Sequence, residues 1–378
     1  MKAVETFRDY FRDEPEFEGQ ANGRVNLIGE HTDYNGGFVL PTSIPQGTRV
    51  WIRRRNDNLV RIVSTNQGGE PAQFIIGEEQ QTKTWTDYVQ GVVWVLRRHF
   101  GASGAIAGFD ILISSTVPMG SGLSSSAALE VAIMKGLRQA WGLGNELDDI
   151  QIAQLSQRVE NEFVGARVGI MDPMAAALAN DGTALFLDTA SLAFNRVPIP
   201  KDKVEIAVVN SGVSHSHAHG GYNQRRSECE QACEILGIKL LRELSVLDLS
   251  QLDRLPDIPK RRARHVLTEN QRVLDAVDCL TGGDMEALGQ LFRLSHASMR
   301  DDYEVSVPEV DRLVEIANAE SNVFGARLTG GGFGGSIVIA ARPGTASSVA
   351  ERVAKQYQQD TGRQPTILVP RLNADTAP

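Results

Sequence analysis

The sequence predicts a protein of the α/β (α+β) class that is built from two domains sharing a cleft. The chain has 378 residues, a length that exceeds one ordinary hydrophobic core and suits two domains. Stretches with the alternation of strands and stretches with helical periodicity follow one another along it. One glycine-rich turn joins a strand directly to a helix, and the unpaired N–H groups at a helix start favour the binding of an anion.

The composition excludes several classes of protein. Hydrophobic residues make up 42% of the chain and charged residues 22%, an ordinary globular mixture, and no apolar run has the length of a membrane span. The net charge of −9 argues against nucleic acid as a partner. The first residues are charged and amphipathic, unlike an export signal. We therefore expect a cytoplasmic protein, favour a monomer, and expect neither nucleic acid nor a membrane as a partner.

The cysteines and a basic run have plain structural interpretations. Cys229, Cys233 and Cys279 are too few for a disulfide framework or a zinc site, so we expect reduced thiols. The basic run at residues 260–264 has no interleaved aromatic residues, which favours a solvated helix face over a nucleic-acid contact.

The serine loop, residues 117–126, is the strongest local signal for a ligand site. Residues 109–114 predict a strand before it and residues 127–134 a helix after it, while Gly120 and Gly122 permit a tight turn. Its last three serines stand where helix caps belong. The helix start therefore predicts a cradle for phosphate oxygens. A capped, serine-rich loop without a ligand is the alternative.

The acidic loop, residues 29–37, is the second such signal. Glu30, His31 and Asp33 bring two carboxylates and an imidazole into four positions, and the following Asn-Gly-Gly turns the chain. Carboxylates on a loop can accept several hydrogen bonds from a polyol and so distinguish one hydroxyl configuration from another. The alternative is an Asx-type turn with a capping Asp33 and an exposed His31.

Asp172 is the third residue with two interpretations. It precedes Pro173, a residue favoured at the first position of a helix, so Asp172 is expected to cap a helix that begins there. It can also be a carboxylate that orients or deprotonates an attacking hydroxyl beside a cation. Both interpretations can hold at once, because a capping carboxylate would be rigidly placed.

The remaining patterns predict the elements around these loops. In the N-terminal half we expect helices at 4–11, 85–100 and 147–164, strands at 24–28 and 183–188, and a hairpin of 48–52 with 59–63. The polar, proline-containing stretch 193–203 predicts the domain boundary, which gives domains 1–198 and 199–378.

The C-terminal half continues with the same kinds of pattern. We expect a strand at 204–209, a helix from about 225, helices between 240 and 319, a glycine-rich loop at 329–336 between two strands, and a final helix and strand at 346–358 and 366–369. His265, Glu269 and His296 fall on ordinary helical patterns and are expected to be structural. The alternating histidines predict a flexible, solvated loop rather than a metal patch: His215, His217 and His219.

Four stretches together resemble the GHMP kinases, the family of galactokinase, homoserine kinase, mevalonate kinase and phosphomevalonate kinase, and most closely its galactokinase branch. The resemblance spans nearly the whole chain and rests on residues 23–37, 118–128, 222–229 and 328–335. It implies an N-terminal domain similar to ribosomal protein S5 and a ferredoxin-like C-terminal domain, with the active site in the cleft between them.

The resemblance also implies a reaction and roles for individual residues. The reaction is transfer of the γ-phosphoryl group of ATP to the anomeric hydroxyl of D-galactose, with Mg²⁺ as cofactor. Asp172 would be the catalytic carboxylate and Arg24 its stabilising cation, while Ser126 and Glu160 would hold the metal. The residues implied to face the sugar are Glu30, His31, Asp33, Gly169 and Tyr222, and those implied to hold ATP are Gly120, Ser121, Gly122, Leu123, Ser124, Ser125 and Ser126.

Departures from the family pattern and two alternative functions stand beside this interpretation. Val168 replaces a usual Cys and Pro173 a usual Gln, and Ser214 and Asn22 stand where family members commonly carry Lys and Ala, whereas the sugar-facing positions are intact. One alternative is a sister sugar kinase acting on N-acetylgalactosamine, arabinose or a uronic acid. The other is a sensor that binds sugar and ATP without turnover, against which the intact Ser126, Ala127 and Asp172 argue.

Overall fold

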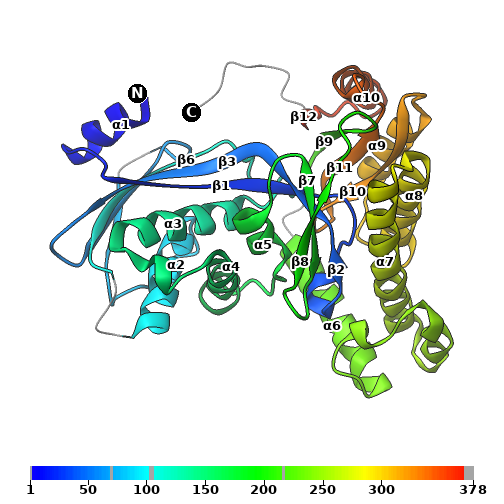
Figure 1. The fold of residues 1–378 in the computed structure, drawn as a ribbon, viewed down its shortest axis with the longest axis horizontal. Coiled ribbons are helices and arrows are strands. Elements are labelled where there is room, and N and C mark those ends of the chain that lie inside the picture. The colour runs from blue at the N-terminus through cyan, green and yellow to red at the C-terminus, as the bar shows by residue number, and fades with distance from the viewer. Residues whose placement is uncertain (1, 69–70, 102–105, 215–217, 370–378) are drawn as a thin grey trace.

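The computed structural model describes residues 2–68, 71–101, 106–214 and 218–369 of the chain. The described strands form an eight-stranded sheet in the N-terminal half and a four-stranded sheet in the C-terminal half (Figure 1). The larger sheet has the order β2-β7-β3-β6-β4-β5, with β1 paired to β3 and β8 to β7. Its strands are β1 (Phe17–Asn26), β2 (Phe38–Val39), β3 (Pro41–Arg54), β4 (Leu59–Ser64), β5 (Ala72–Ile75), β6 (Phe109–Ser115), β7 (Thr183–Asp188) and β8 (Phe194–Pro198).

Helices cover both faces of the larger sheet. Ile111 and Ile113 of β6 point into a core shared with helices α2 to α5, which lie together on one face (Figure 1). The alternate residue Leu112 points to the other face, where Phe7 of α1 is buried. These helices are α1 (Lys2–Phe11), η1 (Asp33–Asn35), α2 (Thr86–Phe100), α3 (Ser125–Trp141), η2 (Leu143–Asn145), α4 (Asp149–Arg158), the π-helical η3 (Val159–Val164) and α5 (Met171–Leu178).

The smaller sheet is antiparallel, with the order β10-β11-β9-β12. Helices α8 and α9 pack on β10, and α10 packs on β9. Its strands are β9 (Glu205–Ser214), β10 (Val323–Thr329), β11 (Gly334–Ala341) and β12 (Thr366–Val369). The helices of this half are α6 (Ala218–Leu236), η4 (Leu241–Glu243), η5 (Val246–Arg254), α7 (Asp257–Gly282), α8 (Met285–Asp301), α9 (Pro308–Ala319) and α10 (Ala346–Thr361).

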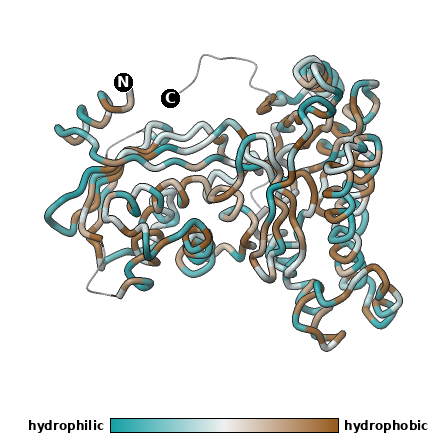
Figure 2. Tube along the Cα trace, viewed as in Figure 1, coloured by the Kyte–Doolittle hydropathy of each residue, from teal (hydrophilic) through white to brown (hydrophobic). Residues whose placement is uncertain are grey.

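An apolar cluster joins the two halves. Val25 and Leu40 from the N-terminal half are buried in one cluster with Val208, Phe292 and Val338 from the C-terminal half. Hydrophobic segments accordingly run along the strands and the inner sides of the helices (Figure 2). Because this cluster includes Leu27 and Ile28, which directly follow β1, it fixes the entry to the acidic loop against the C-terminal half.

The predicted hairpin of residues 48–52 and 59–63 is wrong. Both segments are strands, but β3 and β4 each pair with β6, which lies between them. Alternation of apolar residues indicates that a segment is a strand, and it carries no information about the neighbour with which that strand pairs.

The prediction of a solvated face for the basic run at residues 260–264 is also wrong at its centre. Arg262 is 1% exposed, and its Nε donates to Glu228 at 2.6 Å. Its remaining donors bind the Glu304 carboxylate and the carbonyl oxygen of Asp302. A guanidinium can be buried in this way only because carboxylates from α6 and from the turn after α8 satisfy it.

The predicted boundary at 193–203 contains a strand of the larger sheet. β8 pairs with β7 and ends at Pro198, whereas the first strand of the smaller sheet begins at Glu205. The domain limit between residues 198 and 199 stays a prediction. His215 and His217 lie outside the described residues, and His219 falls at the start of α6, so the choice between a loop and a metal patch stays open.

The described residues include neither a membrane-spanning helix nor a cluster of metal-ligating side chains. No helix in residues 2–68, 71–101, 106–214 and 218–369 is long and apolar enough to cross a membrane. In the same part of the chain no three His, Cys, Asp or Glu side chains are grouped as they would be to hold a metal ion by themselves.

Close packing of α3 on β1 gives a test of the fold. A Cβ at Gly19 would collide with backbone atoms of Ala132 and Gly136, which cannot move independently of the helix. We predict that Gly19→Ala lowers the free energy of unfolding by about 1–3 kcal/mol, measured by urea denaturation. Gly144→Ala is the matched control, because a methyl there would meet none of the described atoms within 4 Å. Equal stability of the two variants would contradict the prediction.

Candidate active site

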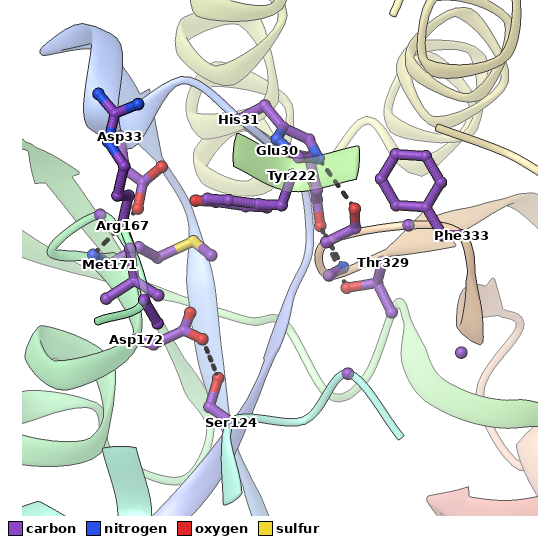
Figure 3. A pocket seen from close by; sticks show the side chains of 18 of the residues that line it. Glu30, His31, Asp33, Ser124, Arg167, Met171, Asp172, Tyr222, Thr329 and Phe333 are labelled. Atoms are coloured by element: carbon purple, nitrogen blue, oxygen red, sulfur yellow. Dashed lines mark hydrogen bonds between the residues drawn. The ribbon is translucent and has the colours of Figure 1, made fainter. Parts of the chain in front are cut away.

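A cavity of about 630 Å³ lies where the loops of the two halves meet (Figure 3). Its walls are the acidic loop, the serine loop, residues 164–172 between η3 and α5, the first turns of α6 and the glycine-rich loop. These segments are far apart in the sequence. The cavity is therefore a product of the way in which the two sheets are joined.

The serine loop has the predicted backbone but not the predicted cap. β6 ends at Ser115 and α3 begins at Ser125, with Gly120 and Gly122 at φ of 70° and 76°, a region that favours glycine. Ser124 occupies the N-cap position, yet it is itself left-handed and its side chain makes no capping hydrogen bond. Its hydroxyl instead donates to Oδ2 of Asp172. The helix start consequently keeps its N–H groups available for an anion.

Asp172 is held by a buried cation. Nε of Arg24 donates to Oδ1 and Nη2 to Oδ2, both at 2.9 Å, so the guanidinium binds the carboxylate with two parallel hydrogen bonds. Nη1 of Arg24 donates to the carbonyl oxygen of Gly122 at 2.5 Å. The side chain of Arg24 is 4% exposed and that of Asp172 is 35% exposed, so the carboxylate faces the cavity while its cation stays behind it.

The capping role predicted for Asp172 is wrong. α5 begins at Met171, its N-cap is Ile170, and Asp172 lies within the first turn. Pro173 then stands one position further into that turn. Because the first N–H groups of a helix have no intrahelical partner, the missing N–H of Pro173 removes no helix hydrogen bond.

Asp33 lies opposite Asp172 and is positioned by Gly169. The backbone N–H of Met171 donates to Oδ2 of Asp33 at 3.4 Å, and a Cβ at Gly169 would overlap the carboxylate. Burial raises the pKa of Asp33 to about 6, and the neighbouring Asp172 adds to this rise. Any side chain at position 169 would overlap this carboxyl group, so the observed position of Asp33 requires Gly169.

Glu30 belongs to a buried ionic network that joins the two halves. Its carboxylate accepts hydrogen bonds from Nη2 of Arg327, from the Thr329 hydroxyl at 3.2 Å and from the Gly330 N–H at 3.0 Å. Burial raises the pKa of Glu30, while the Arg327 guanidinium opposes that rise. Arg327 also lies 3.8 Å from Glu269, which accepts the N–H of Gly29 at 3.0 Å. The expected structural role of Glu269 is thus visible in its contacts.

The acidic loop is not the Asx turn with an exposed histidine that was its alternative interpretation. His31 is 4% exposed, and Tyr34, Tyr222 and Tyr303 pack around its ring. Thr32, and not Asp33, occupies the N-cap position of the short helix η1, and it makes no side-chain cap.

The half-buried Ser126 and the buried Glu160 form a pair of oxygen groups at the start of α3 and in η3. The Ser126 hydroxyl hydrogen-bonds Glu160, and burial raises the pKa of Glu160 to about 7 despite that bond. Glu130, one turn after Ser126 on α3, is fully buried, and neither of its carboxyl oxygens has a hydrogen-bond partner among the described residues. A hydroxyl and a carboxylate surrounded by further acids suit a hard divalent cation that brings its own water and phosphate ligands.

The structure brings most of the predicted site residues to the cavity. Those that line it are Arg24, Glu30, His31, Asp33, Gly120, Gly122, Ser124, Gly169, Asp172 and Tyr222. Ser121, Leu123, Ser125, Ser126 and Glu160 are not among the lining residues. Sequence reasoning missed the inward-facing Thr329 and Phe333 of the glycine-rich loop and Tyr88 of α2. The surrounding cluster of glycines could have indicated Thr329 and Phe333 as site residues. No local signal distinguished Tyr88 from a core residue.

Known families match three parts of the chain. Residues 87–180 match the GHMP kinases N terminal domain, residues 276–359 match the GHMP kinases C terminal domain, and residues 5–54 match the galactokinase galactose-binding signature. A galactokinase of Streptomyces coelicolor is 42% identical over 371 residues, which are 96% of this chain and 94% of the relative. The chain belongs to the galactokinase family of the GHMP kinases.

Other members of this GHMP kinase family extend the likeness. A galactokinase of Haemophilus influenzae (strain Rd) is 42% identical, with 98% of this chain and 96% of the relative covered. The crystal structure of Lactococcus lactis galactokinase complexed with galactose superposes with a TM-score of 0.92 at 33% identity, covering 96% of this chain and 95% of that one. The expected two-domain GHMP kinase fold is therefore confirmed.

The ionic network around Arg327 gives a second test. We predict that Arg327→Met costs about 3–5 kcal/mol of unfolding free energy, because Glu30 and Glu269 then lose their shared cation in a site closed to water. Urea denaturation followed by circular dichroism measures this loss. Arg342→Met is the matched control: Arg342 pairs with Glu286 at 2.8 Å, but both side chains are exposed, so its loss should cost below about 1 kcal/mol. Similar losses in both variants would refute the importance of the buried network.

Proposed function

We propose that this chain is a galactokinase, which transfers the γ-phosphoryl group of ATP to the anomeric hydroxyl of D-galactose. One observation supports this most strongly: the carboxylate of Asp172 faces a cavity that lies between the helix start of the serine loop and the acidic loop. The names of its relatives and the galactose in the Lactococcus lactis complex point to the same substrate. We further propose that it acts as a monomer in the cytoplasm.

In this proposal Asp172 orients the attacking hydroxyl and accepts its proton. Arg24 holds both carboxylate oxygens, so the side chain cannot rotate away from the cavity, and the positive charge stands behind the reacting atoms. The Ser124 hydroxyl of the serine loop donates to Oδ2 of Asp172. This bond would hold the attacking hydroxyl and the phosphates in a fixed relative position. Positioning and charge neutralisation supply most of the acceleration in phosphoryl transfer, and this arrangement offers both.

The sugar would be bound by the wall opposite the serine loop. The carboxylate of Asp33 would accept hydrogen bonds from sugar hydroxyls, and Tyr222 would offer its ring and hydroxyl. Glu30, His31 and Gly169 would shape this wall, Gly169 by leaving room for Asp33. Carboxylates that accept from particular hydroxyls discriminate strongly against an epimer, because the epimer leaves them unpaired.

The phosphates of ATP would lie at the start of α3, with Mg²⁺ held by Ser126 and Glu160. When bound, the cation neutralises the charge that develops on the transferred group. The chain itself supplies the backbone N–H groups of residues 120–126 for the phosphate oxygens. Burial raises the pKa of Glu160 and the charge of Asp172 adds to that rise, so a bound divalent cation would favour the ionised carboxylate.

Removal of the proposed catalytic carboxylate tests this assignment. We predict that Asp172→Asn lowers kcat by about 10²- to 10⁴-fold, because the amide cannot accept the hydroxyl proton. A coupled assay of ADP release measures turnover, and calorimetry shows whether galactose still binds. Asp181→Asn is the control, since Asp181 is an exposed residue paired only with Lys201 in the structure described. If the protein were a sensor without turnover, the wild-type protein would also release no ADP.

The raised pKa of Asp33 predicts a pH dependence. Its carboxyl group is ionised above about pH 6, so kcat/KM for galactose should fall as the pH drops through about 6, with ATP and Mg²⁺ saturating. In Asp33→Asn the KM for galactose should be high at every pH, and this acid limb should be absent. An identical acid limb in wild type and variant would assign the titration to another group.

A further inference from the structure

The imidazole of His31 is fully occupied by protein groups. Nε2 lies 3.2 Å from the carbonyl oxygen of Gly331, and Nδ1 lies 2.9 Å from the hydroxyl of Tyr34. A carbonyl oxygen can only accept, so Nε2 must carry a proton. Although His31 borders the cavity, neither ring nitrogen is left to bind a ligand hydroxyl.

His31 is uncharged in this environment. The ring is buried, and the cationic Arg225 and the neighbouring His265 disfavour a second charge, whereas Glu269 favours one. Burial lowers the pKa of His31 to about 3. A neutral imidazole with a proton on Nε2 has a bare Nδ1, which must accept. Tyr34 therefore donates its hydroxyl proton to His31.

This assignment fixes the direction of a longer chain of hydrogen bonds. The proton of Tyr34 is committed to His31, so the Tyr34 oxygen must accept from Tyr303, whose hydroxyl lies 2.7 Å away. The Tyr303 oxygen then accepts from the thiol of Cys229 at 3.1 Å. Nδ2 of Asn35, a donor only, approaches the sulfur at 3.7 Å. The chain thus runs in one direction, from an amide that can only donate to a carbonyl that can only accept.

The carbonyl at the end of this chain belongs to a loop that also touches the serine loop. Gly331 lies in the glycine-rich loop next to Gly330. A Cβ at Gly330 would lie only 2.9 Å from the carbonyl oxygen of Gly122, so the two loops are in close contact there. At the other end of the same loop, the Ser336 hydroxyl donates to the carbonyl oxygen of Ser121 at 2.7 Å. A displacement of Gly331 would therefore disturb contacts with the serine loop as well as with the acidic loop.

We propose that Tyr34 is a positioning residue that fixes His31 as the Nε2–H tautomer and thereby holds the glycine-rich loop against the acidic loop. Without the Tyr34 hydroxyl, Nδ1 has no donor and only the Gly331 carbonyl still favours the proton on Nε2, so part of the population moves its proton to Nδ1. The lone pair of Nε2 would then face the lone pairs of the Gly331 carbonyl, and the loop would move away. The kinetic consequence of this proposal rests on the galactokinase function proposed above, whereas the tautomer does not.

Nitrogen NMR of the imidazole tests the tautomer without any need for turnover. In protein labelled with ¹⁵N-histidine, with His31 assigned by comparison with His31→Gln, we expect a pyridine-like Nδ1 and a pyrrole-like Nε2. Both shifts should stay unchanged between about pH 5 and pH 8, the range in which an ordinary histidine titrates. A pyrrole-like Nδ1, or a ring that titrates in this range, would overturn the proposal from the wild-type spectrum alone.

Tyr34→Phe tests the role of the hydroxyl, because it keeps the ring and its packing. We expect the two ¹⁵N shifts to move toward each other as tautomers mix, and KM for galactose and for ATP to rise about 5-fold or more, the effect of one lost buried hydrogen bond. A loss of folded protein would lower kcat without this rise in KM. Tyr303→Phe should keep the tautomer, since Tyr34 can still donate, and Tyr10→Phe on the exposed part of α1 should change neither readout.

The possible outcomes separate the two proposals. Unchanged shifts and unchanged KM in Tyr34→Phe would overturn the positioning role. If the shifts behave as expected but ADP release does not depend on galactose, the hydrogen-bond chain stands and the proposed function fails.

Discussion

The buried guanidinium of Arg327 is the interaction on which the geometry of the cavity depends. It projects from β10 of the smaller sheet, yet it donates to Glu30 and, at 3.0 Å, to the carbonyl oxygen of Leu27, both in the N-terminal half. Neither ionic partner is accessible to water, so a displacement that separated them would leave the Glu30 carboxylate buried without the cation that binds it. The two halves are therefore held in one register at the point where the acidic loop enters the cavity.

The glycine-rich loop completes that connection. It lies between the acidic loop, to which Glu30 and His31 bind it, and the serine loop, which it contacts at Gly122. Backbone groups meet at distances that leave no space for a Cβ at Gly330. Three segments separated by about one to three hundred residues thus share one wall, and the proposed sites for sugar and phosphate are built from the same backbone contacts.

Several carboxyl groups gather at or beside the cavity. Burial raises the pKa of Asp33 and that of Glu160, the charge of Asp172 adds to both rises, and Arg24 is the cation that pairs directly with Asp172. Hydroxyl groups of a sugar and a divalent cation are the ligands that such a set of carboxylates requires. The same carboxylates would repel phosphate groups. We therefore place the phosphates at the helix start, whose N–H groups favour anions, rather than among the acids.

The sequence by itself determined the local units: the strand, turn and helix around the serine loop, the carboxylates of the acidic loop, and Asp172 as the residue of interest. Periodicity and turn residues encode such units because they depend on neighbours a few positions away. Only the tertiary structure decided that β6 separates β3 from β4, that Ser124 binds Asp172 instead of capping its own helix, and that Arg262 is buried. It alone revealed Arg327 as the partner of Glu30 and Tyr34 as the donor to His31. Most of these contacts join residues tens to hundreds of positions apart, and even the close pair of His31 and Tyr34 takes its direction from Gly331, so local patterns cannot specify them.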